Sequence, residues 1–113
     1  MLELITAVIK PHMVDDVRVA LINNGVEGMT LTEVRGFGRQ RGKTEVFRGS
    51  EYTVDFVPKV KLEVIVASDV AERIVEVIGT AAQTGKIGDG KVWRIEVASL
   101  LRVRTGEQGD DAL

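Results

Sequence analysis

The chain has 113 residues, which suits one compact domain, and we treat residues 1–113 as a single unit. It contains no cysteine, so disulfides and thiolate metal sites are excluded. Fifteen basic and 17 acidic residues leave a formal net charge of −2, which gives no general attraction to nucleic acid or to an anionic membrane. The N-terminal apolar run is too short for a membrane span and lacks the basic start of a signal peptide, so a cytoplasmic location is expected.

The first predicted element is a β-strand over residues 4–9. Its alternating positions are apolar on both sides, with Ile5 and Ile9 on one and Leu4 and Val8 on the other. A strand with one solvated face alternates between apolar and polar residues, and two helices cover only one face of a sheet. We therefore expect the second face to be buried against other copies of the chain, in a homo-oligomer. The alternative is a monomer with scattered surface apolar residues, which monomers tolerate.

A helical pattern follows, with Val14, Val17 and Leu21 at helix spacing. Two acidic residues near its start suit the positive end of the helix dipole. We expect this helix to end in a left-handed cap at Gly25, and the next strand to run over Met29–Val34.

A long connection, residues 36–58, comes next and carries charges of both signs. Connections longer than ~12–15 residues without secondary structure are uncommon and are usually functional or disordered. Within it, Thr44–Phe47 and Tyr52–Val57 are able to extend as the two strands of a hairpin. A dinucleotide-binding G-x-G-x-x-G pattern fails here because its third glycine is missing. On its residues alone, the segment predicts an exposed interaction loop.

The second half of the chain weakly repeats the first. Leu62–Ile65 (LEVI) resembles Leu2–Ile5 (LELI), and both lead from a strand-like run into a helical pattern. The apolar stripe of the second helix comprises Val70, Ile74, Val77, Ile78 and Ala81. By the same argument this helix ends at Gly85, and a strand over Val92–Ala98 follows. Two β-α-β units predict an α+β fold of the ferredoxin-like type: a four-stranded antiparallel sheet with two helices on one face.

The glycine loop, residues 84–91, carries the strongest chemical pattern. Its Gly85–Lys91 stretch reproduces the G-x-x-x-x-G-K core of a phosphate-binding loop, in which glycines let backbone N–H groups approach a phosphate. Two features depart from that loop: Val92 stands where Ser or Thr would hold magnesium, and the loop runs from helix to strand. The pattern alone leaves phosphate binding and a plain glycine turn equally open, and it argues against a nucleotide hydrolase of the usual design.

The C-terminal segment, residues 102–113, begins within a stretch that alternates apolar and basic residues. In an extended chain Arg102 and Arg104 lie on the same side, where two guanidinium groups suit a polyphosphate. The alternative is an edge strand whose charged side chains prevent pairing with another chain. Together with the glycine loop, however, these arginines form a second cationic element in a chain of net negative charge, which favours phosphate binding.

Catalysis finds little support in the residues. His12, the one histidine, follows Pro11 ahead of the first helix, where a surface or packing role fits better than that of a base. Magnesium would have to be held by oxygen ligands together with a nucleotide's own phosphates. We expect a protein that is not an enzyme, with a small phosphotransferase or ATPase as the alternative. A nucleic-acid-binding module would need exposed aromatic side chains, and the chain has one Trp, one Tyr and three Phe.

Three long motifs resemble the nitrogen-regulatory P-II signal proteins: Thr44–Tyr52 (TEVFRGSEY), Val54–Val60 (VDFVPKV) and Thr84–Lys91 (TGKIGDGK). The resemblance runs from about Leu4 to the C-terminus and includes Ile9-Lys10-Pro11, Gly28-Met29-Thr30 and Arg102-Val103-Arg104-Thr105-Gly106. It implies a homotrimer of ferredoxin-like subunits that binds ATP or ADP in the clefts between neighbours. In such a trimer, residues 88–91 would cradle the phosphates, and the two C-terminal arginines would reach them from the neighbouring subunit.

The residues that the resemblance assigns to the nucleotide site are Thr30, Gly38, Arg39, Gln40, Glu63, Gly88, Asp89, Gly90, Lys91, Arg102 and Arg104. Gln40 would also coordinate Mg²⁺ together with ATP, and the same ion would bind 2-oxoglutarate through its keto acid. Lys59 would neutralise the far carboxylate of 2-oxoglutarate, with the backbone near Ile87 and Gly88 helping. In this assignment Gln40 and the ligands would hold the magnesium ion, which Val92 is unable to do because it has no hydroxyl group.

The long connection corresponds to the effector-binding T-loop of the family. Tyr52 matches the tyrosine that many members carry as a site of uridylylation or adenylylation, a simple contact residue being the alternative. Arg48 matches the arginine that members closing ammonium channels insert into the pore. The resemblance therefore implies a non-catalytic signal-transduction protein of nitrogen regulation that senses ATP, ADP and 2-oxoglutarate. Its expected partners are an ammonium channel, a glutamine synthetase-modifying enzyme, a sensor kinase or an arginine-pathway kinase, with no nucleic acid and contact with a membrane only through a channel.

Overall fold

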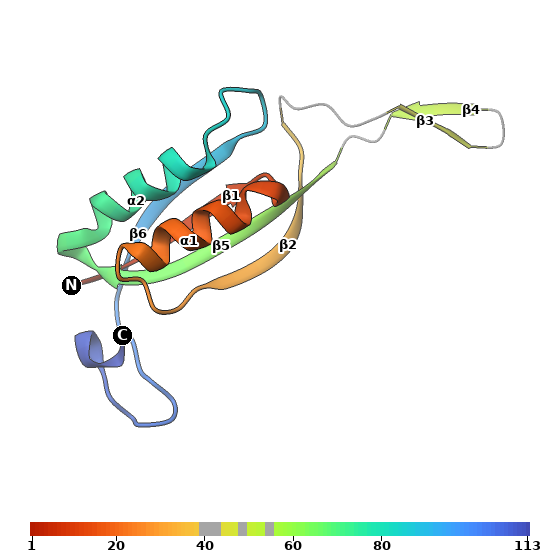
Figure 1. Cartoon of the computed structure of the whole chain (residues 1–113). Helices are drawn as coiled ribbons and strands as arrows, with labels where there is room; N and C mark the ends of the chain where they lie inside the picture. Colours follow the sequence, from red (N-terminus) through yellow and green to blue (C-terminus); the bar gives the residue numbers. More distant parts are fainter. Residues whose placement is uncertain (39–43, 48–49, 54–55) are drawn as a thin grey trace.

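A computed structural model describes residues 1–38, 44–47, 50–53 and 56–113 of the chain, with the backbone alone for 44–47 and 50–53. The domain has two layers, a twisted antiparallel sheet and a pair of helices that lie together on one of its faces (Figure 1). The sheet strands are β1 (Leu2–Ile9), β2 (Thr30–Gly36), β5 (Val57–Ala67) and β6 (Gly90–Val97), in the order β2-β5-β1-β6. The helices are α1 (Val14–Asn23) and α2 (Ser68–Ala82), with short 3-10 turns at Pro11–Met13 and Gly109–Ala112. The predicted ferredoxin-like arrangement is confirmed.

The core lies between the helices and the inner face of the sheet. Ile5 and Leu62 are fully buried, on neighbouring strands, and the helices contribute Leu21, Ile74 and Ile78. Each such side chain contributes about 1.5–3 kcal/mol when its apolar surface leaves water. The predicted stripes of both helices therefore face the sheet, and this packing fixes the ends of the strands from which the candidate site is built.

The two helices end differently. Beyond α1, Gly25 has a φ of +87°, and its N–H donates to the carbonyl of Ile22, so the predicted left-handed cap is confirmed. The prediction that α2 ends at Gly85 is wrong, because this helix stops at Ala82 and the chain is already extended at Gln83. Gly85 does have a φ of +83°, but it lies inside the glycine loop, where the backbone N–H groups of residues 84 and 85 donate to a side-chain carboxylate.

The long connection contains the predicted hairpin. Strand β3 (Thr44–Phe47) pairs with β4 (Ser50–Thr53) in a separate two-stranded sheet that extends away from the main sheet (Figure 1). The second strand was predicted over Tyr52–Val57, but it runs over Ser50–Thr53, and Val57 belongs to the main sheet. Both ends of the connection belong to the main sheet, since Gly36 closes β2 and Val57 opens β5.

The C-terminal segment does not form the extended strand that its alternation predicted. Leu101 forms an isolated bridge with Gln108, and the chain turns back over residues 103–105. The N–H of Arg102 donates to the carbonyl of Glu107, and the N–H of Gly106 donates to the carbonyl of Arg102. The prediction that Arg102 and Arg104 share one side of a strand is therefore wrong, because local turn hydrogen bonds replace an extended pairing.

The outer face of the sheet, opposite the helices, carries apolar side chains as predicted. Thr6 of β1 pairs with Glu63 and Trp93, and Leu4 pairs with Ile65 and Ile95, so these residues point to the same side. Trp93 is 44% exposed and Ile95 is 55% exposed. Among the described residues, no helix has the length and apolar character that crossing a membrane requires.

Candidate functional site

The glycine loop leaves the end of α2 and returns to the sheet at β6. Gly90, the first residue of β6, pairs with Ile9 and has a φ of +101°. A Cβ atom at this position would lie 1.8 Å from the carbonyl oxygen of Val8, so a side chain is excluded. Gly90 therefore allows the loop to lie directly against β1, with its backbone close to the surface on which a ligand would sit.

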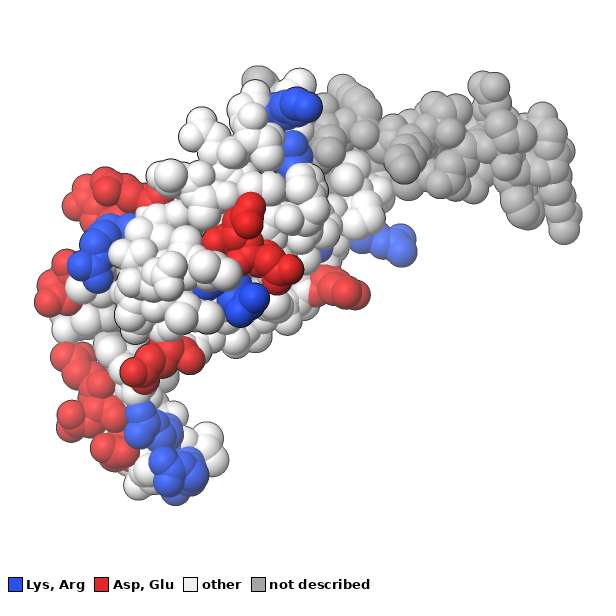
Figure 2. All heavy atoms as spheres, viewed as in Figure 1, with Lys and Arg blue, Asp and Glu red and all other residues white. Residues whose placement is uncertain are grey.

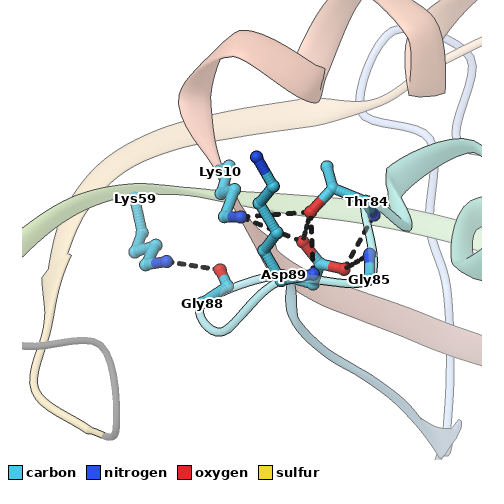
Figure 3. Close-up of polar contacts among 7 residues, drawn as sticks. Lys10, Lys59, Thr84, Gly85, Gly88 and Asp89 are labelled. Carbon is cyan, nitrogen blue, oxygen red and sulfur yellow. Dashed lines mark hydrogen bonds and ion pairs between the residues drawn. The ribbon is translucent and has the colours of Figure 1, made fainter.

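The side chain of Asp89 points into the glycine loop and ties its two ends together (Figure 3). One carboxylate oxygen accepts the N–H of Thr84 at 2.7 Å and the N–H of Gly85 at 2.8 Å. The other oxygen accepts the Thr84 hydroxyl at 2.5 Å and lies 3.1 Å from Nζ of Lys10. The hydrogen bonds from Thr84 are the main cause that holds the pKa of Asp89 well below its usual value, so the carboxylate is ionised at neutral pH.

Lys59 brings a positive charge to the same loop from β5. Its side chain is nearly buried, and Nζ donates to the carbonyl oxygen of Gly88 at 2.5 Å (Figure 3). Burial lowers the pKa of Lys59, the charge of Lys10 lowers it further, and the charge of Asp89 raises it. A partly desolvated ammonium group at a loop backbone suits an anionic ligand, because the interaction is screened less than at an exposed position.

A cavity of about 790 Å³ lies beside the glycine loop, and we call it the loop cavity. It brings together seven of the predicted site residues: Gly38, Lys59, Ile87, Gly88, Asp89, Gly90 and Lys91. Phe37 also lines it and packs on Phe56 with ring centroids 5.9 Å apart, where the long connection leaves and rejoins the main sheet.

Two other predicted residues line a different cavity. Thr30 pairs with Glu63, and both line a second cavity of about 660 Å³, which we call the C-terminal cavity because Leu100 and Leu113 also line it. Of the β5 residues, 63–67 line the C-terminal cavity, whereas Val57 and Lys59 line the loop cavity. The predicted site is therefore divided between two ends of one subunit.

The predicted phosphate-binding arginines belong to the second of these two ends. Arg102 pairs with Glu107 at 3.1 Å and donates to the carbonyl oxygen of Leu113, which lines the C-terminal cavity. Arg104 is exposed on the turn. In Figure 2 the basic side chains of the C-terminal segment stand apart from the body of the domain. One chain does not bring Arg102 and Arg104 to the glycine loop.

Three predicted site residues, Arg39, Gln40 and Arg48, lie outside the described residues. Tyr52 is described by its backbone only, in β4, where it pairs with Glu45. Among the described residues, no group of three or more His, Cys, Asp or Glu side chains is arranged to hold a metal ion. The predicted Mg²⁺ donor, Gln40, lies outside the residues covered by this statement.

No role was predicted for Lys10 or for the Thr84 side chain, although both lie in the motifs of the resemblance. The structure places both against Asp89. A usable signal was present: Thr and Asp side chains flanking a glycine-rich stretch are typical of turns that bond their own backbone. Lys10 was harder to recognise, because it lies 74 positions from Thr84 in the chain.

Comparison with known proteins agrees with this architecture. The family described as "Nitrogen regulatory protein P-II" matches residues 2–107. The chain belongs to the P-II family. It is 56% identical over 109 residues to the nitrogen regulatory protein P-II of Klebsiella oxytoca and to P-II 1 of Escherichia coli K12, covering 96% of this chain and 97% of each relative.

A solved structure gives the same result for the fold. PII of Arabidopsis thaliana, in a crystal structure bound to citrate, superposes with a TM-score of 0.81 at 36% identity. The match covers 99% of this chain and 92% of the plant protein. This P-II protein thus belongs to a family of nitrogen regulatory proteins, and its fold is that of a member solved with a small molecule.

Proposed function

We propose that this P-II protein is a sensor without turnover, a homotrimer that binds ATP or ADP between subunits and 2-oxoglutarate beside ATP. The proposal rests on the observation that the predicted site residues lie in two separate places on one subunit. The glycine loop with Lys91 lies at one end of the sheet, and Thr30, Glu63 and the arginines of the C-terminal segment lie towards the other. A neighbouring copy that presents its C-terminal end to the loop cavity would complete the site. The apolar outer face of the sheet supports such an assembly.

The loop cavity suits the phosphates of the nucleotide. Residues 88–91 supply backbone N–H groups and one lysine, and Gly90 lets the backbone approach closely. Thr30 and Glu63, in the C-terminal cavity, would serve the nucleoside. Gly38 lines the loop cavity. Arg39, as the family resemblance implies, would stand beside the phosphates.

Mg²⁺ fits this chain as an ion brought by the nucleotide. The described residues lack a carboxylate cluster for it, and the Asp89 carboxylate is occupied within the glycine loop. Gln40 would hold the ion together with phosphate oxygens, and the ion would then offer a site for the keto acid of 2-oxoglutarate. Lys59, with the loop backbone at Ile87 and Gly88, would bind the distal carboxylate. Citrate in the plant relative is likewise a polycarboxylate, which supports an organic acid as a ligand of this fold.

Signalling would pass through the β3–β4 hairpin, whose strands pair with each other in a sheet separate from the main one (Figure 1), and target proteins would bind there. Its two connections leave the main sheet beside the loop cavity, at Gly36 and Val57, so ligands there are well placed to alter it. Tyr52 would be the site of uridylylation or adenylylation, and Arg48 the residue inserted into a channel. The targets would be an ammonium channel, a glutamine synthetase-modifying enzyme, a sensor kinase or an arginine-pathway kinase.

Calorimetric titration of 2-oxoglutarate into the purified protein tests the mechanism, with Mg²⁺–ATP, with Mg²⁺–ADP and with neither present. Binding is expected only with Mg²⁺–ATP. Linkage then requires 2-oxoglutarate to tighten ATP binding by the same factor. Gln40→Ala should abolish 2-oxoglutarate binding while ADP still binds. A protein that binds no adenine nucleotide would contradict the proposal, and steady conversion of ATP to ADP would favour the alternative of a slow ATPase.

A further inference from the structure

We infer that the side chains of Lys10, Thr84 and Asp89 hold the glycine loop in its phosphate-binding conformation without themselves touching the ligand; the inference rests on the proposed function. Asp89 lies inside the loop that would bind phosphate, yet it is an anion and would repel one. Its surroundings show what it does instead. Figure 3 shows its carboxylate directed at Thr84, Gly85 and Lys10.

The carboxylate of Asp89 is fully engaged by the protein. Two backbone N–H groups, the Thr84 hydroxyl and the Lys10 ammonium group share its two oxygens. A carboxylate offers about four lone-pair sites, so these four donors account for its capacity. Asp89 therefore has no oxygen left to coordinate a metal ion or to accept from a ligand. Its backbone is free to take part in the loop surface while its side chain shapes that surface.

Thr84 is the centre of the network. Its hydroxyl donates to Asp89 at 2.5 Å and accepts from Nζ of Lys10 and from the N–H of Lys86, both at 3.2 Å. The hydroxyl thus joins the first part of the loop, the last part of the loop and the end of β1. Since the side chain of Thr84 is uncharged, it affects an anionic ligand only through the geometry that it imposes.

Lys10 anchors this arrangement to the rest of the domain. It directly follows β1, its backbone is extended before Pro11, and its side chain is mostly buried. The ion pair with Asp89 balances a negative charge that would otherwise face an incoming phosphate. Lys59 adds a second tie from β5, through the carbonyl of Gly88. The loop is therefore held from two strands before any ligand arrives, which lowers the entropic cost of binding.

Two readings of Asp89 predict opposite results. If its charge only repels phosphate, Asp89→Asn should tighten ATP binding, because the positive charges of Lys10, Lys59 and Lys91 remain. If Asp89 positions the loop, the same variant should weaken binding, because the amide fails to reproduce the full set of hydrogen bonds. Asp16→Asn, which removes the same charge from an exposed position on α1, is the matched control.

The test is calorimetric titration of Mg²⁺–ATP into the full-length protein and its variants. Thr84→Val, which keeps shape and charge but removes the hydroxyl, should weaken ATP binding by about tenfold. Thr84→Ser, which restores the hydroxyl, should return the affinity to within about twofold of the wild-type value. Circular dichroism and the mass in solution confirm that each variant is folded and assembled.

The outcomes separate this inference from the proposed function. A wild-type protein that fails to bind ATP overturns the proposed function. If the wild type binds ATP and Thr84→Val binds it with the same affinity, only the positioning role is overturned. The same holds if Asp89→Asn binds ATP more tightly than the wild type. If Asp89→Asn fails to fold, the comparison of Thr84→Val with Thr84→Ser decides, since neither changes the charge of the loop.

Discussion

The identity of Gly90 is tightly constrained by its surroundings. A Cβ there would lie 1.8 Å from the Val8 carbonyl oxygen, and the φ of +101° is strained for any other residue. Gly90→Ala should lower the free energy of unfolding by about 3 kcal/mol or more, and should weaken nucleotide binding because β6 separates from β1 near the loop. Urea unfolding and ATP titration measure the two effects.

Gly79 provides the control for that substitution. It lies on the exposed side of α2, and an added Cβ would meet no atom within 4 Å. Gly79→Ala should raise the free energy of unfolding by about 0.5–1 kcal/mol, since alanine favours a helix interior. Equal destabilisation at both positions would contradict the close-approach explanation of Gly90.

The lowered pKa of Asp89 predicts that the free energy of unfolding depends on pH. Its pKa is lowered in the folded protein from 3.8, chiefly by the Thr84 hydroxyl, so its contribution to stability is complete above the unfolded value. That contribution should be lost as the pH falls below 3.8 towards the folded value. Wild type should therefore exceed Asp89→Asn in free energy of unfolding by a constant amount at about pH 5–7, and the difference should shrink below about pH 4. A difference that grows on acidification would contradict the sign.

At the scale of elements, hydrophobic periodicity predicted the strands and helices because each has one face that must be buried. Val17 and Leu21 of α1, and Ile74 and Ile78 of α2, lie where their spacing placed them. Hydrophobic periodicity gave a wrong boundary where hydrogen bonds to a side chain determine the backbone conformation. Helix α2 stops before Gly85 because Asp89, several residues further on, takes up N–H groups of the glycine loop.

The prediction of a strand in the C-terminal segment was wrong for a similar reason. Its alternation of Leu, Arg, Val and Arg predicted a strand, but the sheet already ends with β6 at Val97, and the segment forms a turn closed by its own backbone. Alternation predicts a strand only where a neighbouring strand is available for pairing.

Removal of the C-terminal segment tests whether it belongs to the site or to the core. The described core residues all precede it, so a chain ending at Leu101 should keep its free energy of unfolding within about 1 kcal/mol. Loss of Arg102 and Arg104 should weaken ATP binding by at least about a hundredfold, since two charged hydrogen bonds at about 1.5–3 kcal/mol each together contribute about 3 kcal/mol or more. A full-length double variant, Arg102→Gln with Arg104→Gln, should match the truncation. Unchanged affinity in both would remove the arginines from the site.

At the scale of the whole molecule, the limit of sequence reasoning lies in how the site is divided. Patterns in the chain identify the glycine loop and the C-terminal arginines separately, and only the fold shows that one subunit keeps them apart. The residues of the loop cavity come from positions as distant as Val8 and Trp93, which strand pairing brings together. In the proposed homotrimer a second copy would join the two ends. The apolar pattern of the first strand predicts that other copies are present, but it does not predict which residues they bring to the site.

Assembly through the outer face of the sheet predicts the mass of the protein in solution. Ile95 is 55% exposed on this face, and Ile22 is 52% exposed on α1, so the two offer a matched pair. In light scattering the wild type should have about three times the 12.3 kDa mass of the chain. Ile95→Lys should dissociate it, because assembly would bury an unpaired ammonium group, whereas Ile22→Lys should leave the mass unchanged.

Fluorescence and ligand binding then connect assembly with function. Trp93, the one tryptophan, lies on the same face as Ile95, so its emission should shift to longer wavelength when Ile95→Lys exposes it. The dissociated variant should also lose ATP binding, although its glycine loop and its arginines are unchanged, because each site of the proposed homotrimer would need both ends from different copies. A monomeric variant that bound ATP like the wild type would place the complete site within one chain, and would refute both the assembly and the divided site.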